Sequence, residues 1–194
     1  MNGEIDTERV QIEFIRSAIH YFIAGRFSAI VHLFPVSGNL LHHAIEMLLK
    51  GVLAKNHTLN QLATFRHDLV SIWAAFKKVF TYSDLSQFDS VIEKLHRFER
   101  IRYPDKLLVE GMSAQFARFR DDFVKSENGN NPKTQVYNLV MEEVDDLVKA
   151  IFTLSKMNPL FYCESLSDEA RHFLLLHNAH SFLQTNNPSL TATE

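Results

Sequence analysis

The sequence predicts an all-α bundle, and three observations support this class. Of the 194 residues, 46% are hydrophobic, including 16 Phe, while only 6 Gly and 5 Pro are present. That balance supplies a sizeable core and argues against disorder, collagen-like chains and loop-rich sandwiches. Apolar residues recur at three-four spacing almost throughout, and no segment alternates clearly enough to predict a strand.

Five core helices are expected along residues 1–157, which form one domain. The first covers about 6–34, and Pro35 and Gly38 interrupt the helical pattern. The second extends to about residue 55, and 55–66 form a connection. The third carries an apolar stripe over 69–80. The fourth begins at an N-cap formed by Ser83 or Asp84 and ends before Pro104.

The remaining chain is expected to be helical as well. Residues 112–125 are predicted to form a short helix, 126–133 a polar loop, and 134–157 the long fifth core helix. Residues 158–194 are expected to add a linker, a C-terminal helix and a frayed tail, all packed on the same domain. Ser167, Asp168 and Glu169 are expected to start this last helix, which ends near residue 184.

Composition and charge narrow the class of protein. The formal net charge is −3, so nucleic-acid binding would require a local basic patch. Cys163 is the only cysteine, which excludes an internal disulfide and a cysteine-based zinc site and fits a reducing compartment. Residues 1–10 are polar and acidic, unlike a signal peptide, and the uncharged stretch 27–45 contains Pro35, Gly38 and three histidines. A soluble cytoplasmic protein without a membrane partner is therefore expected.

The second predicted helix combines an apolar surface with a polar strip. At about 100° per residue, the apolar side chains of 39–53 cover an arc of roughly 220°, so this helix should be central. The strip holds Asn39, His43, Glu46 and Lys50, with His42 at its edge.

Three interpretations of this strip are open. We favour a solvated or interface strip on a core helix. A dimetal site would need a Glu-x-x-His unit, which the sequence lacks, so we predict neither a metal nor another cofactor. The third interpretation is a polar groove for an anionic ligand.

Three short sequences along the chain share their order and spacing with a known family. They are "AIEMLLK" from Ala44 to Lys50, His67-Asp68-Leu69 before the third helix, and Arg102-Tyr103-Pro104 after the fourth. Together they resemble the HEPN domain family, named for nucleotide binding in higher eukaryotes and prokaryotes, over about residues 10–156. The resemblance implies an up-and-down helical bundle, a homodimer, and binding of nucleotide or RNA. It also implies a partner such as a nucleotidyltransferase or another product of a defence operon.

Many members of that family are metal-independent ribonucleases with an arginine, four to six residues and then a histidine on a late helix. In such a site, arginine holds a phosphate and histidine acts as general acid or base. This chain has two matches, Arg26 to His32 and Arg171 to His177, whereas about 1.5 are expected by chance. The first lies in the wrong helix, the second lies beyond the expected one, and 134–157 contains no Arg or His.

A basic segment supplies the main candidate ligands. Residues 94–106 carry five Lys or Arg against two acidic residues. The planar forks of Arg100 and Arg102 suit phosphate, and Tyr103 can stack on a base. An ordinary solvated charged face explains the same residues equally well.

We therefore predict a HEPN-like homodimeric module that binds nucleotide or RNA without a clear catalytic motif. Its ligand-binding candidates are Arg100, Arg102, Tyr103, Lys50, Glu46, His67 and His43. The first alternative is a metal-independent ribonuclease of a toxin or defence system that uses Arg171 and His177. The second alternative is a protein-interaction or immunity module.

Overall fold

The computed structural model describes residues 6–34, 36–98, 108, 112–119, 135–175 and 178. Helices dominate these ranges and confirm the all-α class. The elements in chain order are α1 (Thr7–Ile30), α2 (Val36–Leu53), α3 (Leu59–Thr64), α4 (Leu69–Val79), the 3₁₀ turn η1 (Ser86–Phe88), α5 (Asp89–Phe98), β1 (Met112–Ala117), β2 (Gln135–Val140), α7 (Met141–Ser155), α8 (Pro159–Cys163) and α9 (Asp168–Leu175).

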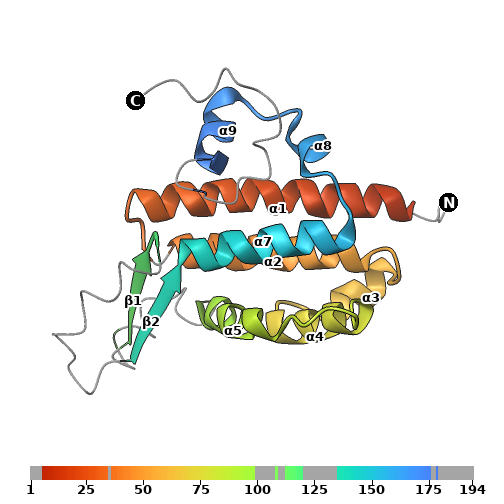
Figure 1. The fold of residues 1–194 in the computed structure, drawn as a ribbon, viewed down its shortest axis with the longest axis horizontal. Coiled ribbons are helices and arrows are strands. Elements are labelled where there is room, and N and C mark those ends of the chain that lie inside the picture. The colour runs from red at the N-terminus through yellow and green to blue at the C-terminus, as the bar shows by residue number, and fades with distance from the viewer. Residues whose placement is uncertain are drawn as a thin grey trace.

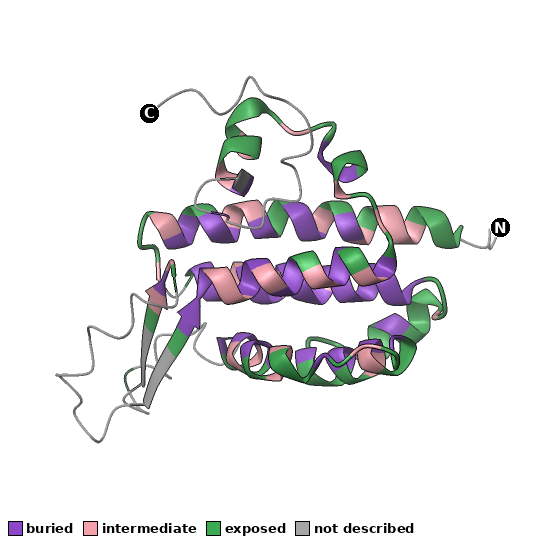
Figure 2. Ribbon diagram, in the orientation of Figure 1, coloured by how far each residue is buried: buried purple, intermediate pink, exposed green. Residues whose placement is uncertain are grey.

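The helix α2 is the central element of the bundle. It packs against α1, α4, α5 and α7, with α4 and α5 on one side of it and α8 and α9 beyond α1 on the other (Figure 1). Thirteen of its 18 residues are buried, as Figure 2 shows along most of the helix. The broad apolar arc read from the sequence therefore predicted its place correctly.

Apolar side chains from these helices form a continuous core. Ile15 of α1, Ile45 of α2, Phe76 of α4 and Ile151 of α7 are all completely buried. Each comes from an amphipathic helix that presents its apolar face to the centre. None of the helices in the described ranges has both the length and the apolar character to cross a membrane.

The helices α2 and α5 approach closely where Gly38 faces Phe98. A Cβ atom built on Gly38 would lie only 2.1 Å from the Phe98 ring, so the approach requires glycine. Phe98 is fully buried and is the last residue of α5. This contact fixes the C-terminal end of α5 against the first turn of α2.

A buried ion pair joins α1 to α7. Arg26 Nη1 pairs with a carboxylate oxygen of Asp145, and each side chain is only 2% exposed. Arg26 Nε also donates a hydrogen bond of 3.1 Å to the carbonyl oxygen of Phe173 in α9. Arg26 thus holds three helices together, whereas His32, its partner in the sequence match, lies beyond the end of α1.

The strand pair contradicts three predictions made from periodicity, the first of which was that no segment forms a strand. Strands β1 and β2 run parallel, with residues 112–117 opposite 135–140. The short helix expected over 112–125 is therefore wrong in its described part, and the long helix begins at Met141 instead of residue 134. The segment "QVYNLV" is rich in residues that favour strands, and pairing with β1 overrides its equally good helical spacing. The helix α7 begins where Glu142 and Glu143 favour a helix N-terminus.

Smaller differences concern the connections and helix ends. The expected connection 55–66 contains α3, which Thr58 and Gln61 open with a capping box, and the expected linker contains α8, with Pro159 in its first turn. The helix α5 begins at Asp89 after η1, later than the predicted N-cap. The C-terminal helix begins at Asp168 as expected, and most of its predicted second half lies outside the described residues.

Candidate functional site

Glu46, in the middle of α2, is a buried carboxylate surrounded by nitrogen atoms. Its side chain is 0% exposed. Lys50 Nζ lies 2.6 Å from Oε1, and His67 Nδ1 lies 3.0 Å from Oε2. His43 Nδ1 and His42 Nε2 lie 3.4 Å and 3.7 Å from that same Oε2 atom. Four of the ligand candidates chosen from the sequence therefore meet at one point.

Helix geometry accounts for the neighbours that come from α2. At about 100° per residue, Glu46 lies between His42 and His43 around the helix axis, and Lys50 follows about one turn later. Because α2 is packed on several sides, this strip is largely internal: His42, Glu46 and Lys50 are 1%, 0% and 6% exposed. The solvated or interface strip that we favoured from the sequence is therefore wrong for these three residues, which are buried within a single chain.

His67 reaches Glu46 from the turn between α3 and α4. Arg66 in this turn has a φ of 50°, a left-handed conformation that costs a non-glycine residue about 1–2 kcal/mol. Its carbonyl oxygen accepts a hydrogen bond of 2.6 Å from Lys50 Nζ. The next residue but one, Asp68, caps the N-terminus of α4. The lysine and the cap together hold the turn in the conformation that places His67 beside the carboxylate.

Glu46 remains ionised although it is buried. Burial by itself would raise its pKa, but hydrogen bonds from His43, Lys50 and His67, together with the Lys50 charge, lower the pKa from 4.5 to about 2. A carboxylate only accepts hydrogen bonds, so Nδ1 of His67 carries a proton. Nε2 of His67 is then the nitrogen left for a ligand.

Three rings lie where this cluster reaches the surface. The side chains of His43 and His67 are 25% and 54% exposed, and their ring centroids are 5.6 Å apart. Tyr21 of α1 is 40% exposed, and its ring lies 5.6 Å from that of His43. We call Tyr21, His43 and His67 the aromatic rim. Such rings offer faces for stacking on a base and polar atoms for hydrogen bonds to it.

His42 lies on the inner side of the cluster and is oriented by α5. Its Nδ1 atom lies 3.0 Å from the carbonyl oxygen of Leu95. Because a carbonyl oxygen only accepts, Nδ1 donates and Nε2 is the nitrogen that faces Glu46. The His96 ring, next along α5, lies 6.4 Å from the His42 ring. Sequence reasoning placed His42 only at the edge of the strip and did not single out Tyr21, because Tyr21 joins the site through the packing of α1 on α2.

The remaining candidates stand apart from this cluster or beyond the described residues. Arg100, Arg102, Tyr103 and His177 lie outside the described ranges. The chain leaves α5 at Phe98, beside Gly38 and two residues before Arg100 in sequence. Gly38 precedes His42 by about one helical turn, so Phe98 contacts α2 close to the cluster.

Arg171 lies in α9, which packs on α1 away from α4 and α5 (Figure 1). Its Nη2 atom donates a hydrogen bond of 3.1 Å to the carbonyl oxygen of Glu164, and Nη1 lies 3.7 Å from the Asp168 carboxylate. The side chain is 45% exposed. The structure therefore uses Arg171 to close the turn between α8 and α9 and does not bring it to Glu46.

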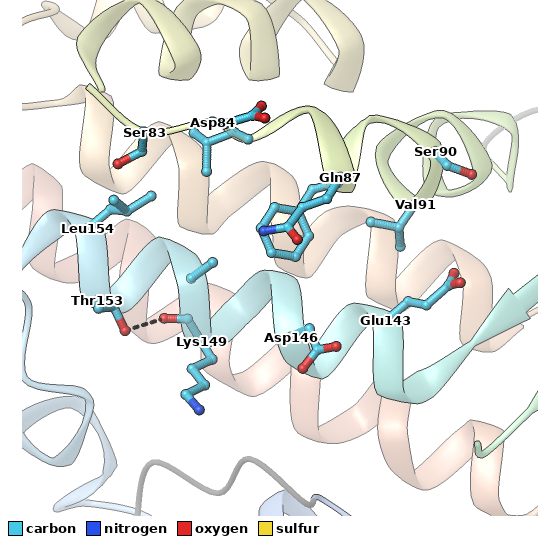
Figure 3. Close-up of a pocket in the computed structure, with 13 residues that line it drawn as sticks. Ser83, Asp84, Gln87, Ser90, Val91, Glu143, Asp146, Lys149, Thr153 and Leu154 are labelled. Carbon is cyan, nitrogen blue, oxygen red and sulfur yellow. Dashed lines mark hydrogen bonds between the residues drawn. The ribbon is translucent and has the colours of Figure 1, made fainter. Parts of the chain in front are cut away.

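A hollow of about 650 Å³ lies away from this cluster, between the α4–α5 connection and α7. Figure 3 shows Ser83, Asp84 and Gln87 on one side and Glu143, Asp146 and Lys149 on the other. Glu143 is paired with Lys94 at 3.0 Å. Three carboxylates against one lysine in the lining disfavour a phosphate ligand, and none of the candidates within the described residues lines this hollow.

Replacement of Glu46 by glutamine should destabilise the fold by about 3 kcal/mol, because it removes the charge that a buried lysine and the histidines share. The matched control is Glu143→Gln, whose partner Lys94 is 29% exposed and whose loss should cost less than about 1 kcal/mol. Urea unfolding followed by circular dichroism measures both. Equal losses in the two variants would show that Glu46 is not a structural centre.

The free energy of unfolding should also decrease as the pH falls through a defined range. The pKa of Glu46 is depressed in the folded chain, so its contribution is present above pH 4.5 and is lost as the pH falls from 4.5 to about 2. The depression corresponds to about 3 kcal/mol. The difference in unfolding free energy between the wild-type chain and Glu46→Gln should shrink across this window, while Asp68 and Asp89, whose pKa values are also lowered, act equally in both. A difference that does not change with pH would contradict the assignment.

Comparisons with known proteins do not extend this description. The chain has no match among protein-family models, curated proteins or solved structures. The side chains around Glu46 and the short sequences to which they belong are therefore the features that indicate a function.

Proposed function

We propose that this protein is a HEPN-like module that binds single-stranded RNA or a nucleotide at the aromatic rim and acts as a homodimer. The observation that carries the proposal is the contact of both Lys50 and His67 with Glu46. These three residues come from two of the short sequences that resemble the family. Their contact gives the resemblance a physical basis, because the two sequences form one polar unit.

Within this proposal the polar residues have two different tasks. Glu46 and Lys50 are buried, so they position the histidines and do not touch the ligand. His43, His67 and Tyr21 are partly exposed and make the contacts, by stacking on a base and by hydrogen bonds. The phosphates are assigned to Arg100 and Arg102, with Tyr103 as a further stacking residue.

The basic segment provides local positive charge in a chain whose net charge is negative. A chain with a formal charge of −3 does not attract RNA by its overall field. The described part of the basic segment ends at Phe98, which contacts Gly38 about one helical turn before His42. We assign the phosphate contacts to Arg100 and Arg102, which follow Phe98 in the sequence. Arg171 and His177 have no part in this proposal.

Removal of the Tyr21 ring should weaken binding of a short fluorescein-labelled single-stranded RNA about tenfold at low salt, because one stacking contact is lost. The measurement is fluorescence anisotropy, and the matched control is Tyr82→Ala. Tyr82 is 72% exposed and lies past the end of α4 opposite to His67. The double variant Arg100→Ala/Arg102→Ala should also bind less tightly and show a shallower dependence on salt. Equal affinities of Tyr21→Ala and Tyr82→Ala would contradict the placement of the ligand at the rim.

The dimer is assigned to the apolar surface at the α1–α2 turn. Leu33 and Val36 are each 51% exposed there, and Val31 is 43% exposed. Leu33→Lys should convert a two-chain species into a single chain in sedimentation-velocity ultracentrifugation, because a charge would be placed in the contact. Leu59→Lys, which is 37% exposed on α3 at the other end of α2, should leave the dimer intact. A wild-type chain that sediments as a monomer at all concentrations tested would exclude the homodimer.

A further inference from the structure

Three donor groups of α2 lie close enough together to share one ion. One ligand atom each from His42, His43 and Glu46 lies within 4.8 Å of the others. The Glu46 oxygen Oε2 is 3.7 Å from His42 Nε2 and 3.4 Å from His43 Nδ1. Donors around a tetrahedral zinc ion, with bonds of about 2.0–2.2 Å, are separated by about 3.4 Å. The two oxygen–nitrogen distances thus match those of ligands around a single ion.

The orientation of His42 resembles that of a metal ligand. Its Nδ1 atom donates to the carbonyl oxygen of Leu95 at 3.0 Å. A metal-bound histidine commonly donates its second nitrogen to a backbone carbonyl, which fixes the tautomer and leaves a lone pair on the first. Here the first nitrogen, Nε2, is the one that faces Glu46. The α5 backbone therefore holds His42 in the state that coordination requires.

A fourth donor comes from outside α2. His67 Nδ1 lies 3.0 Å from the same Glu46 oxygen, and its side chain is 54% exposed. It is placed either to complete the coordination or to give way to a water molecule. The resulting set of imidazole nitrogens with one carboxylate oxygen suits zinc-like ions, whereas calcium and magnesium prefer oxygen donors throughout.

We propose that His42, His43 and Glu46 bind one divalent transition-metal ion of the zinc class, with His67 as the fourth ligand. Lys50 contacts Oε1 and so leaves Oε2 to the ion. The Nδ1 atoms of His43 and His67 become ligands when their protons move to Nε2, so each ring stays neutral. From the sequence we predicted no metal, because a dimetal bundle needs a Glu-x-x-His unit. The structure suggests a different site, in which the reversed spacing together with His67 supplies donors for one ion. This inference does not depend on RNA binding.

The test uses the full-length chain without a histidine tag, stripped with a chelator and titrated with Co²⁺ and then Zn²⁺. We expect saturation at one ion per chain, with the intense visible absorption of four-coordinate Co²⁺, which Zn²⁺ then displaces. His43→Gln should weaken binding at least tenfold. The control is His20→Gln, an exposed histidine on α1 that is not one of the four proposed ligands. Thermal unfolding of the metal-free variants verifies that they fold, and His67→Gln, which alters the most exposed ligand, replaces His43→Gln if that variant does not.

Binding that does not saturate at one ion, a six-coordinate Co²⁺ spectrum, or equal weakening by the His20 control would overturn the metal site. The metal-free chain is also assayed with the labelled RNA. If Tyr21→Ala binds the RNA as tightly as the wild-type chain does, while the titration still shows one bound ion, the RNA proposal alone is refuted. If Tyr21→Ala weakens RNA binding but the titration shows no bound ion, the metal site alone is refuted.

Discussion

Burial of the Glu46 charge is the constraint on which the polar part of this structure depends. An ionised carboxylate in a helical core is tolerated only when partners replace its water. Lys50 supplies one partner from the next turn of α2, and His67 supplies another from a distant turn. Lys50 in turn binds the carbonyl oxygen of Arg66, whose left-handed backbone would otherwise be costly. One carboxylate thus determines how the α3–α4 turn is placed on the central helix.

Polar residues that look alike as candidates in the sequence occupy two different environments in this cluster. Glu46 and Lys50 belong to the interior, whereas His43 and His67 extend from the same carboxylate to the surface. A ligand at the rim, whether a base or a metal-bound group, would be held by side chains whose own positions are set by the buried pair. Substitution of the interior residues would then affect binding indirectly, through the fold. Only substitutions at the rim test whether a side chain contacts the ligand.

Helical periodicity was sufficient to predict the all-α class, the central place of α2 and most of the apolar stripe of α4. It failed at 112–117 and 135–140, because strand pairing between distant segments leaves no local signal and "QVYNLV" satisfies both patterns. The candidates His43, Glu46, Lys50 and His67 were chosen from the sequence, but their contact depends on how α4 packs on α2. Burial of the strip and the part played by Tyr21 likewise follow from tertiary packing. Arg26, whose spacing to His32 matched the family motif in the wrong helix, forms an ion pair with Asp145 that spacing does not reveal.

The link between Glu46 and His67 can be observed directly by NMR. Long-range ¹H–¹⁵N correlation spectra of the labelled chain, recorded at about pH 8.5 where an ordinary imidazole is neutral, distinguish the two tautomers of each ring. Our account requires His67 to carry its proton on Nδ1 in the wild-type metal-free chain and to lose that preference in Glu46→Gln. A wild-type His67 protonated on Nε2, or a tautomer that is unchanged by the substitution, would contradict it.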